Sequence, residues 1–390
     1  MKKNRFSTPS IPVVAVAFGL ASALSASAQF YGDPPDETHP WAVHDMNRPQ
    51  PPKVEPGKTV GSAPSDAVVL FDGTGKAFKD NWRHEKQKRK GDWKIVGGMI
   101  QCTPKAGNLR TKAEFGDCQL HIEWAEPADI KGSGQGRGNS GIFLMGLPEI
   151  QVLDNYSNPT YPDGSAGSLY GVMPPMANAL KKTGEWQVYD IVFRRPVFRD
   201  GKLVDQGYVT VLLNGVLVQD HTPLEGSGGH KHRSHPKPFP EKGPLVLQDH
   251  GNPVRFRNIW YRALPKRPVE GGTDGMLTPE ACAAKRAEIA ADIRKDAAGK
   301  AGKDKMLRLM ESLCYQVDKA AVAEIDKLGA DFVKNVKATP ANKIGGRRGE
   351  VMQVNNAVKY LVRHKRMPAD WTLSKELDAL VKANGWGKKK

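Results

Sequence analysis

The sequence is poor in cysteine, with only four among 390 residues. No two cysteines form a C-x-x-C pair, which disfavours zinc-ribbon sites, and no C-x-x-C-H motif is present to attach haem. Aromatic residues make up only 7% of the chain, which weighs against nucleic-acid binding by base stacking. A long apolar run is also missing, because the stretch from Ile11 to Leu24 is shorter than the ~20 residues of a membrane-spanning helix.

Residues 1–28 have the pattern of a secretory signal peptide. Three basic side chains precede the apolar stretch, and Ala26-Ser27-Ala28 is a small-residue cleavage signal before Gln29. No cysteine follows directly to carry a lipid, and no arginine pair precedes the apolar stretch. We therefore expect export by the general secretory route to the periplasm or the exterior, with no transmembrane anchor after the signal is removed.

The rest of the chain divides by its periodicity. Residues 29–65 contain many prolines and few aliphatic residues, which predicts an extended leader without its own core. From 66 to 264, short apolar runs broken by Gly, Asn and Pro predict an all-β sandwich, in which Asn214-Gly215 marks a hairpin turn. After a linker at 265–274, apolar residues at helical spacing predict a small all-α domain at 275–390.

The predicted helical domain is basic. It begins with a capping Thr278 followed by Pro279, and the chain carries 26 Lys and Arg against 16 Asp and Glu from Pro265 onward. The net charge of the whole chain is +16. Because the basic residues are scattered around the helices of an exported protein, nucleic acid is not an expected partner. We interpret the tail as a solvated surface facing anionic envelope material.

The four cysteines fall two to each domain. Cys102 and Cys118 flank a β excursion, and Cys282 and Cys314 lie on consecutive predicted helices. Exported proteins commonly oxidise such pairs, so the sequence predicts the disulfides Cys102–Cys118 and Cys282–Cys314. Closing a loop of about 15 residues would stabilise the fold by about 3 kcal/mol.

Polar side chains interrupt an apolar strand at Glu149-Ile150-Gln151-Val152-Leu153-Asp154. Burying unpaired carboxylates is costly, so polar groups that converge on one face indicate a binding or catalytic cleft. A bulge between Gln151 and Asp154 would turn all three polar side chains to one side. A strand edge with solvated acids is the structural alternative. The spacing is that of E-x-D-x-x-E in laminarinase-type glucanases, but the amide at Gln151 argues against a pair of catalytic carboxylates.

Two further segments supply candidate site residues. Asn139 begins a strand that is joined to the Glu149 strand by a short link, which favours an antiparallel pair. Near the end of the β region, one strand pair carries Gln248, His250, Arg255 and Arg257. Repeated cations need an anionic partner, and Glu149 and Asp154 are the candidates. The cluster at 229–235, with three histidines, could bind a metal ion, but its interleaved cations favour an exposed insertion.

At these residues the chain resembles the 3-keto-disaccharide hydrolase family, also described as 3-keto-glucoside 1,2-lyases and hydratases and formerly as a domain of unknown function. The resemblance covers about 68–264 and omits the helical tail, and the histidine-rich insertion departs from it. It implies a concanavalin-like jelly roll. The motifs that carry it occur in this order: Leu70-Phe71-Asp72-Gly73, Trp93 with Gly97-Gly98, Asn139-Ser140-Gly141, Glu149-x-Gln151-x-x-Asp154, Tyr170-Gly171, Glu185-Trp186, Asn214-Gly215, Leu247-Gln248-Asp249-His250-Gly251 and Phe256-Arg257-Asn258-Ile259.

The resemblance implies cleavage of 3-keto-glycosides. A base removes the proton at C2, the C1 oxygen is expelled, and hydration of the product gives net hydrolysis. A separate 3-dehydrogenating oxidoreductase must supply the substrate. We expect either Glu149 or His250 to be the base, with Asp154 orienting His250. Alternatively, Glu149, Asp154 and His250 hold a divalent metal ion.

The predicted substrate-binding residues are Asn139, Gln151, Tyr170, Gln248 and Arg257, with Arg257 on a carboxylate or a substrate oxygen. All of the predicted site residues are expected around one concave pocket. Two other functions fit the sequence. A non-catalytic carbohydrate-binding module of an envelope protein would use the same cleft. Alternatively, the β domain is a spacer and the basic tail is the active partner.

Overall fold

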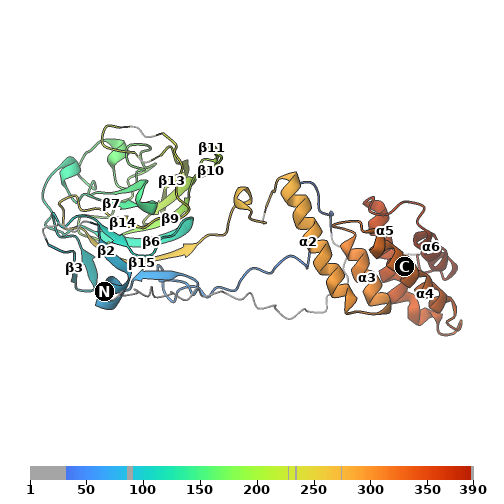
Figure 1. The fold of residues 1–390 in the computed structure, drawn as a ribbon. Helices are drawn as coiled ribbons and strands as arrows, with labels where there is room; N and C mark the ends of the chain where they lie inside the picture. The colour runs from blue at the N-terminus through green and yellow to red at the C-terminus, as the bar shows by residue number, and fades with distance from the viewer. Residues whose placement is uncertain (1–31, 86–90, 227, 233–234, 274, 388–390) are drawn as a thin grey trace, which may run out of the picture. The chain divides into compact units, whose positions relative to one another are not determined.

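The computed structural model describes residues 32–85, 91–226, 228–232, 235–273 and 275–387. The described residues form two compact units: residues within 51–274 form the β unit, and residues 32–50 join 275–387 in the helical unit (Figure 1). Each unit has its own hydrophobic core. The predicted signal peptide and the three terminal lysines lie outside the described residues. No described helix has the length and apolar character needed to cross a membrane.

The β unit is a sandwich of two antiparallel sheets (Figure 1). The large sheet has the order β13-β12-β9-β6-β15-β4-β3, with β1 also pairing β15, and the small sheet has the order β2-β5-β14-β7-β8. A separate hairpin consists of β10 (Val197–Arg199) and β11 (Lys202–Asp205). The large-sheet strands are β1 (Val68–Phe71), β3 (Lys94–Val96), β4 (Met99–Gln101), β6 (Cys118–Ala125), β9 (Gln187–Arg194), β12 (Tyr208–Leu213), β13 (Val216–Pro223) and β15 (Arg255–Ala263). The small-sheet strands are β2 (Trp82–His84), β5 (Leu109–Thr111), β7 (Ser140–Phe143), β8 (Glu149–Val152) and β14 (Val246–Leu247).

Alternation along the strands builds the core between the sheets. In β9 and β12, buried side chains recur at every second position, because consecutive residues of a strand face opposite sides. The small sheet contributes Leu109, Ile142, Ile150 and Leu247, and the large sheet contributes Leu120, Ile122, Trp124, Tyr189, Ile191 and Phe193. The predicted Asn-Gly turn joins β12 to β13, and Asn214 and Gly215 both have positive φ, as a two-residue hairpin requires. The expected mainly β architecture is therefore present.

Short helical elements decorate the sandwich. The helix α1 (Gly75–Asn81) is capped by Thr74, whose hydroxyl accepts a hydrogen bond from the Ala77 amide. The remaining turns are η1 (Gly134–Gly136), η2 (Leu144–Gly146), η3 (Pro162–Gly164) and η4 (Pro268–Glu270). Of these, η1 and η3 stand beside β8 and shape the candidate site described below.

The helical unit contains α2 (Pro279–Ala298), α3 (Gly302–Ser312), α4 (Lys319–Lys337), α5 (Arg348–Arg363) and α6 (Thr372–Ala383), with the turn η5 (Ile344–Arg347). The helix α2 begins where the sequence predicts, with the Thr278 hydroxyl accepting a hydrogen bond from the Ala281 amide. Apolar faces of these helices enclose a core that includes Ile293, Met310, Ile325, Val358 and Leu377. The tail is therefore a helical bundle with its own core.

The segment predicted as an extended leader is divided between the two units. Residues 32–50, here called the strap, pack on the helices: the Tyr360 hydroxyl donates to the Gly32 carbonyl at 2.8 Å, and Arg366 donates to the Pro35 carbonyl at 3.0 Å. Residues 51–65 belong to the β unit, where the Gly61 carbonyl accepts from Trp260. The segment lacks its own core, but each half uses the core of a neighbouring unit. The β unit is thus inserted between the strap and α2.

The predicted disulfides are wrong: all four cysteines are free and buried. Cys102 lies opposite Val254 at one end of β15, and Cys118 lies opposite Ala263 at the other end. Nine residues of strand separate these positions, which is roughly 30 Å and far beyond the reach of a disulfide.

In the helical unit, the two thiols face different parts of the strap. The Cys282 thiol donates to the Asp36 carbonyl at 3.3 Å. Burial, together with the charges of Glu311 and Asp45, raises the pKa of the Cys314 thiol. Each cysteine therefore acts as a small buried residue of its own unit.

Candidate active site

The small sheet carries a polar face opposite its core face. In β8, Ile150 faces the core, so Glu149 and Gln151 face outward. Gln151 lies opposite Gly141 of β7, and the backbone amide of Gln248 donates to the Gly141 carbonyl at 3.0 Å. Glu149, Gln151 and Gln248 are therefore neighbours on one face, as the sequence predicts.

The glycine at position 141 leaves room for the side chain of Glu149 on the neighbouring strand. A Cβ placed on Gly141 would lie 2.1 Å from Oε1 of Glu149, far inside contact distance. The missing side chain leaves the space in which the Glu149 carboxylate lies. The glycine of one strand thus positions the carboxylate of the next.

Burial controls the ionisation of Glu149. Only 8% of the residue is exposed, and this desolvation raises the pKa of its carboxyl from 4.5 to about 7. Among the described residues, no ion pair or hydrogen bond to the carboxylate offsets this burial. Near neutral pH both protonation states are populated, which suits a group that takes up and returns a proton.

Gln135, on η1, joins two of the predicted residues. The Gln151 side-chain amide donates to Oε1 of Gln135 at 3.0 Å and to the Gly164 carbonyl at 3.2 Å. The side-chain amide of Asn139 donates to the backbone carbonyl of Gln135 at 2.8 Å. Asn139 and Gln151 are therefore held in one amide network on this side of the sheet.

Two side-chain oxygens in this region lack a partner. Oε1 of Gln151 and Oε1 of Gln248 are buried and accept no hydrogen bond from the residues that the structure describes. A buried acceptor without a donor is costly unless water or a ligand supplies one. Sugar hydroxyls are donors of this kind, so the two oxygens are candidate contacts for a saccharide.

A cavity of about 310 Å³ adjoins this polar face. It is lined by Tyr161, Asp163, Tyr170, Gly171, Gly229, His230, Lys231 and His232. The hydroxyls of Tyr161 and Tyr170 are 2.8 Å apart, and the Tyr170 hydroxyl lies 3.5 Å from Nδ1 of His230. The Tyr170 amide donates to the Glu149 carbonyl at 3.0 Å, which ties the cavity to β8.

The pKa of Tyr170 reflects the same surroundings. Burial, the hydrogen bond with Tyr161 and the nearby charge of Glu149 all raise it. Tyr170 therefore keeps its proton near neutral pH and can donate a hydrogen bond. The cavity thus offers a neutral hydroxyl donor near a carboxylate that titrates near neutrality.

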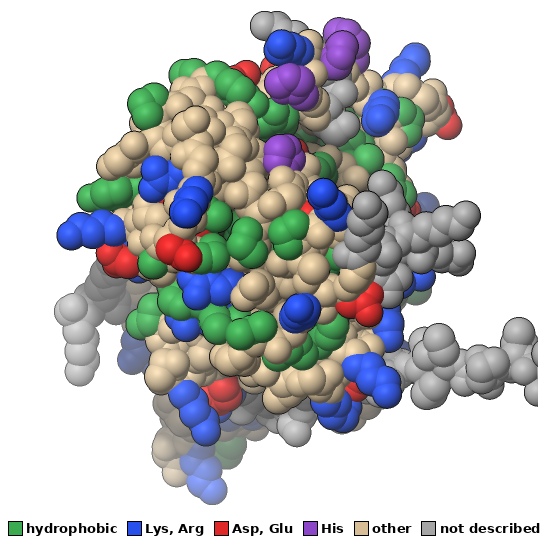
Figure 2. Space-filling model, turned by 90° about the vertical axis from the view of Figure 1, so that its left-hand side faces the viewer, with side chains coloured by type: hydrophobic (Ala, Val, Ile, Leu, Met, Phe, Trp, Pro, Cys, Tyr) green, Lys and Arg blue, Asp and Glu red, His purple; other side chains and the backbone are tan. Residues whose placement is uncertain are grey.

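The histidine-rich insertion forms one wall of this cavity. His230, Lys231 and His232 are exposed, as expected for an insertion, but they face the two tyrosines. A Cβ on Gly228 would lie 1.8 Å from the Tyr170 carbonyl, so the backbone of the insertion packs directly on the Tyr170 segment. Figure 2 shows histidine side chains gathered at one edge of this face, among exposed Lys and Arg.

Asp154 does not join Glu149. β8 pairs with β7 without a register shift from Glu149 to Val152, and Asp154 lies beyond the end of this ladder. The Asp154 carboxylate is buried, pairs with Nε of Arg137 at 2.6 Å and accepts from the Thr183 hydroxyl at 3.0 Å. It anchors the chain around Arg137 rather than facing the cavity.

Arg257 also lies apart from Glu149, on the other sheet. His250 is exposed in the turn after β14 and does not line the cavity beside Glu149. Arg257 belongs to the large sheet, where it pairs with Glu123 at 2.6 Å and lies 3.9 Å above the ring of Trp186. Because the neighbouring Phe256 faces the core, Arg257 faces the outer side of the large sheet. The expectation of one pocket for all the predicted residues is therefore wrong.

The predicted metal ligands do not form a site. The described residues contain no group of three His, Cys, Asp or Glu side chains that could hold a metal ion. Asp154 is already neutralised by Arg137, and His250 lies in the turn after β14. Glu149, Asp154 and His250 thus do not fit a shared ion.

Comparison with known proteins identifies the family of the β unit. A family of domains described as 3-keto-alpha-glucoside-1,2-lyase-like matches residues 66–262, about half of the chain. The chain belongs to this family. The matched region is the sandwich that carries Glu149, so the family's fold and the candidate site coincide. The helical unit lies outside the match.

Two relatives of the lyase-like domain are informative. A 3-keto-disaccharide hydrolase of Bacteroides thetaiotaomicron is 27% identical over 246 residues, covering 50% of this chain and 78% of that protein. A crystal structure from Parabacteroides distasonis, named a candidate glycosyl hydrolase, is 44% identical with a TM-score of 0.52. That match covers 56% of this chain and 93% of the other.

Sequence reasoning missed Gln135, Tyr161 and Asp163. Gln135 lies in a glycine-rich loop, and the other two lie in a turn without strand periodicity. A signal for Tyr161 was present, because an aromatic residue follows Pro159 and precedes Pro162 at an exposed loop. That signal alone did not indicate which strand the loop covers.

Proposed function

We propose that this protein is an enzyme that cleaves 3-keto-glycosides, with Glu149 as the base. The observation that carries the proposal is the buried Glu149 carboxylate, with its pKa raised to about 7, beside a cavity of about 310 Å³. Family membership and the 3-keto-disaccharide hydrolase from B. thetaiotaomicron support this substrate class. Support from the fold alone would be weaker, because one fold hosts many functions.

The first step is proton removal. A ketone at C3 acidifies the hydrogen at C2, and the ionised Glu149 takes that proton while the electron pair forms an enediolate. Hydrogen bonds to the C3 oxygen stabilise its developing charge. Tyr161 and Tyr170 are the hydroxyl donors that line the cavity.

The second step expels the glycosidic oxygen. The enediolate electrons form the C1–C2 double bond as the C1–oxygen bond breaks, and the leaving oxygen takes one proton. Protonated Glu149 can return the proton that it accepted, so the step balances without a second carboxylate. Addition of water across C1–C2 then gives net hydrolysis. Double-displacement hydrolysis would need two carboxylates about 5 Å apart, whereas Gln151 is an amide and Asp154 is engaged by Arg137.

Side-chain amides on the outer face of the small sheet orient the substrate. The unpartnered oxygens of Gln151 and Gln248 accept hydrogen bonds from sugar hydroxyls, while Gln135 and Asn139 hold Gln151 in place. No step is routed through a metal ion, because the predicted ligands are not brought together.

The test uses Glu149→Gln and a 3-keto-glucoside. We expect kcat/KM to fall at least about 100-fold, the usual contribution of a general base, while the ligand still binds. For the wild type, kcat/KM should rise with pH through an apparent pKa near 7, because the base must be ionised. A chelator control separates a metal requirement from this effect. Undiminished turnover by the variant would refute the role of Glu149, and a wild type that binds without turnover would favour the binding-module function.

We also propose that the enzyme acts after export. The support is the signal-peptide pattern of residues 1–28, and the 3-keto substrate implies a separate oxidoreductase that dehydrogenates the sugar at C3. Fractionation of the producing cells, with N-terminal sequencing of the mature protein, tests this. Cytoplasmic protein that retains Met1 would contradict it.

A further inference from the structure

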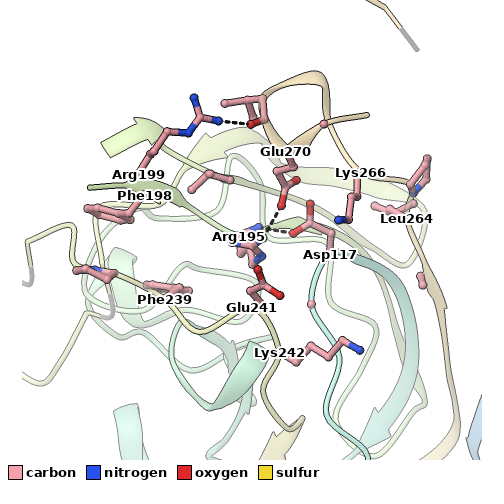
Figure 3. Close-up of a pocket in the computed structure, with 17 residues that line it drawn as sticks. Asp117, Arg195, Phe198, Arg199, Phe239, Glu241, Lys242, Leu264, Lys266 and Glu270 are labelled. Carbon is pink, nitrogen blue, oxygen red and sulfur yellow. Dashed lines mark hydrogen bonds and ion pairs between the residues drawn. The ribbon is translucent and has the colours of Figure 1, made fainter. Parts of the chain in front are cut away.

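The β unit contains a second cavity, of about 710 Å³, that shares no lining residue with the cavity beside Glu149 (Figure 3). Its walls come from the approach to β6, from β10, from residues 238–242, and from the chain between the end of β15 and η4. A Cβ on Gly116 would lie 2.6 Å from the Glu241 carbonyl, so two of these walls touch through their backbones. The cavity is therefore built into the sandwich.

The carboxylates deepest in this cavity are already paired. Asp117 accepts a hydrogen bond from the Arg195 amide at 2.9 Å and pairs with Arg194 at 3.2 Å. Glu270 pairs with Arg195 (Figure 3). It also pairs with Arg267 at 3.0 Å. Burial alone would raise the pKa of Glu270, but its hydrogen bond with Arg267 and the charges of both arginines lower it. Asp117 and Glu270 are thus held by arginines and form the wall of the cavity.

Two lysines remain available for a ligand. Lys242 and Lys266 line the cavity, are exposed, and form no ion pair with any residue that the structure describes. Arg199 adds a third cation, which donates one hydrogen bond to the Val269 carbonyl at 2.8 Å. Glu241 is the one exposed carboxylate of the lining. The accessible charge of the cavity is therefore mainly positive, which attracts an anion.

Two half-buried aromatic rings form another wall. Phe198 and Phe239 line the cavity on one side, and Lys242 and Lys266 lie on the other in Figure 3. An aromatic wall with a few cationic groups is typical of a small-molecule site, and the volume falls within the usual range of ~300–1,000 Å³. A pyranose ring presents an apolar C–H face to an aromatic ring, and a carboxylate on that sugar can reach a lysine.

We propose that this cavity is a second ligand site that binds an acidic saccharide through its carboxylates. The insertion that closes the cavity beside Glu149 continues into this one: residues 229–232 line the first, and 238–242 line the second. The six Cα–Cα steps from His232 to Pro238 span at most about 22 Å, so the two linings lie within the reach of one short oligosaccharide. The proposal concerns binding and stands whether or not Glu149 is a catalytic base.

The test is calorimetric titration of the mature protein with trigalacturonate, with maltotriose as the neutral control. We expect the acidic trisaccharide to bind, with an affinity that falls as salt rises. The double variant Lys242→Gln/Lys266→Gln should bind about tenfold more weakly, because it loses two charge-assisted contacts. The matched variant Lys79→Gln/Lys202→Gln removes two exposed lysines outside the lining and should bind like the wild type.

Further arms identify the site and the ligand class. Glu149→Gln should bind trigalacturonate unchanged, whereas Phe239→Ala should weaken it. Absence of binding by the wild type would overturn the proposal, as would equal weakening in both double-lysine variants or a loss confined to Glu149→Gln. Equal affinity for maltotriose would overturn the role of the carboxylates. Stronger binding of a short polyglutamate would assign the cavity to acidic peptides instead. Circular dichroism of each variant verifies its fold.

Discussion

Replacing Glu149 by Gln should stabilise the protein while it removes catalysis. The Glu149 pKa is 4.5 in the unfolded chain and about 7 in the folded one, because burial penalises the charged form. Between these values the folded state binds more protons, so stability falls as pH rises from about 4.5 to about 7. Above pH 7 the full cost applies. A shift of about 2.5 pH units corresponds to about 3 kcal/mol.

The amide of Gln has nearly the shape of a carboxylic acid but does not ionise. Glu149→Gln should therefore match the wild type near pH 4.5 and exceed its unfolding free energy by up to about 3 kcal/mol at pH 8. Urea titrations at the two pH values, followed by near-ultraviolet circular dichroism, measure the difference. Glu225→Gln, at an exposed position of the same unit, is the matched control and should show no such gain. Equal pH dependence in Glu149→Gln and wild type would refute the reasoning.

Four further outcomes are expected. Gly141→Ala should lower kcat/KM at least about 100-fold in a folded protein, because its Cβ would displace the Glu149 carboxylate; unchanged kinetics would contradict the packing. Arg257→Gln should leave kcat/KM within about twofold, because Arg257 lies on the other sheet; a large loss would return it to the site. Asp154→Asn should lower the urea midpoint by an amount equivalent to about 2–3 kcal/mol through loss of the Arg137 ion pair, with modest effect on turnover; the reverse pattern would assign it to catalysis. Thiol titration in urea without reductant should count four thiols, and a count of zero or two would indicate disulfides.

The polar face of β8 could be predicted because a strand's alternation is local. Ile150 and Val152 fix which side is the core, so Glu149 and Gln151 must face the other way. The short link between the two segments also predicted that the strand after Asn139 pairs with the Glu149 strand, as β7 and β8 do. Nothing beyond two-residue periodicity and antiparallel pairing was needed for these residues.

The rest of the site depends on features that periodicity does not encode. The predicted bulge would have turned the Asp154 carboxylate toward Glu149. In the structure, an ion pair with Arg137 neutralises that carboxylate instead. The sequence around Arg257 resembles that of a site residue. The pairing of distant strands, however, places Arg257 in the large sheet rather than beside Glu149. Tyr161 and His230 come from loops, whose positions follow from the packing of the sandwich beneath them.

The strap also sets the order in which the molecule can be completed. Its residues leave the ribosome before the β unit, and their helical partners leave after it, so about 220 residues separate the two. Trp41 therefore emerges well before the helices that bury it. The helical unit is therefore the last part to close. A shortened protein that keeps the strap without the helices would carry that unburied surface permanently, whereas one that begins at residue 51 would not.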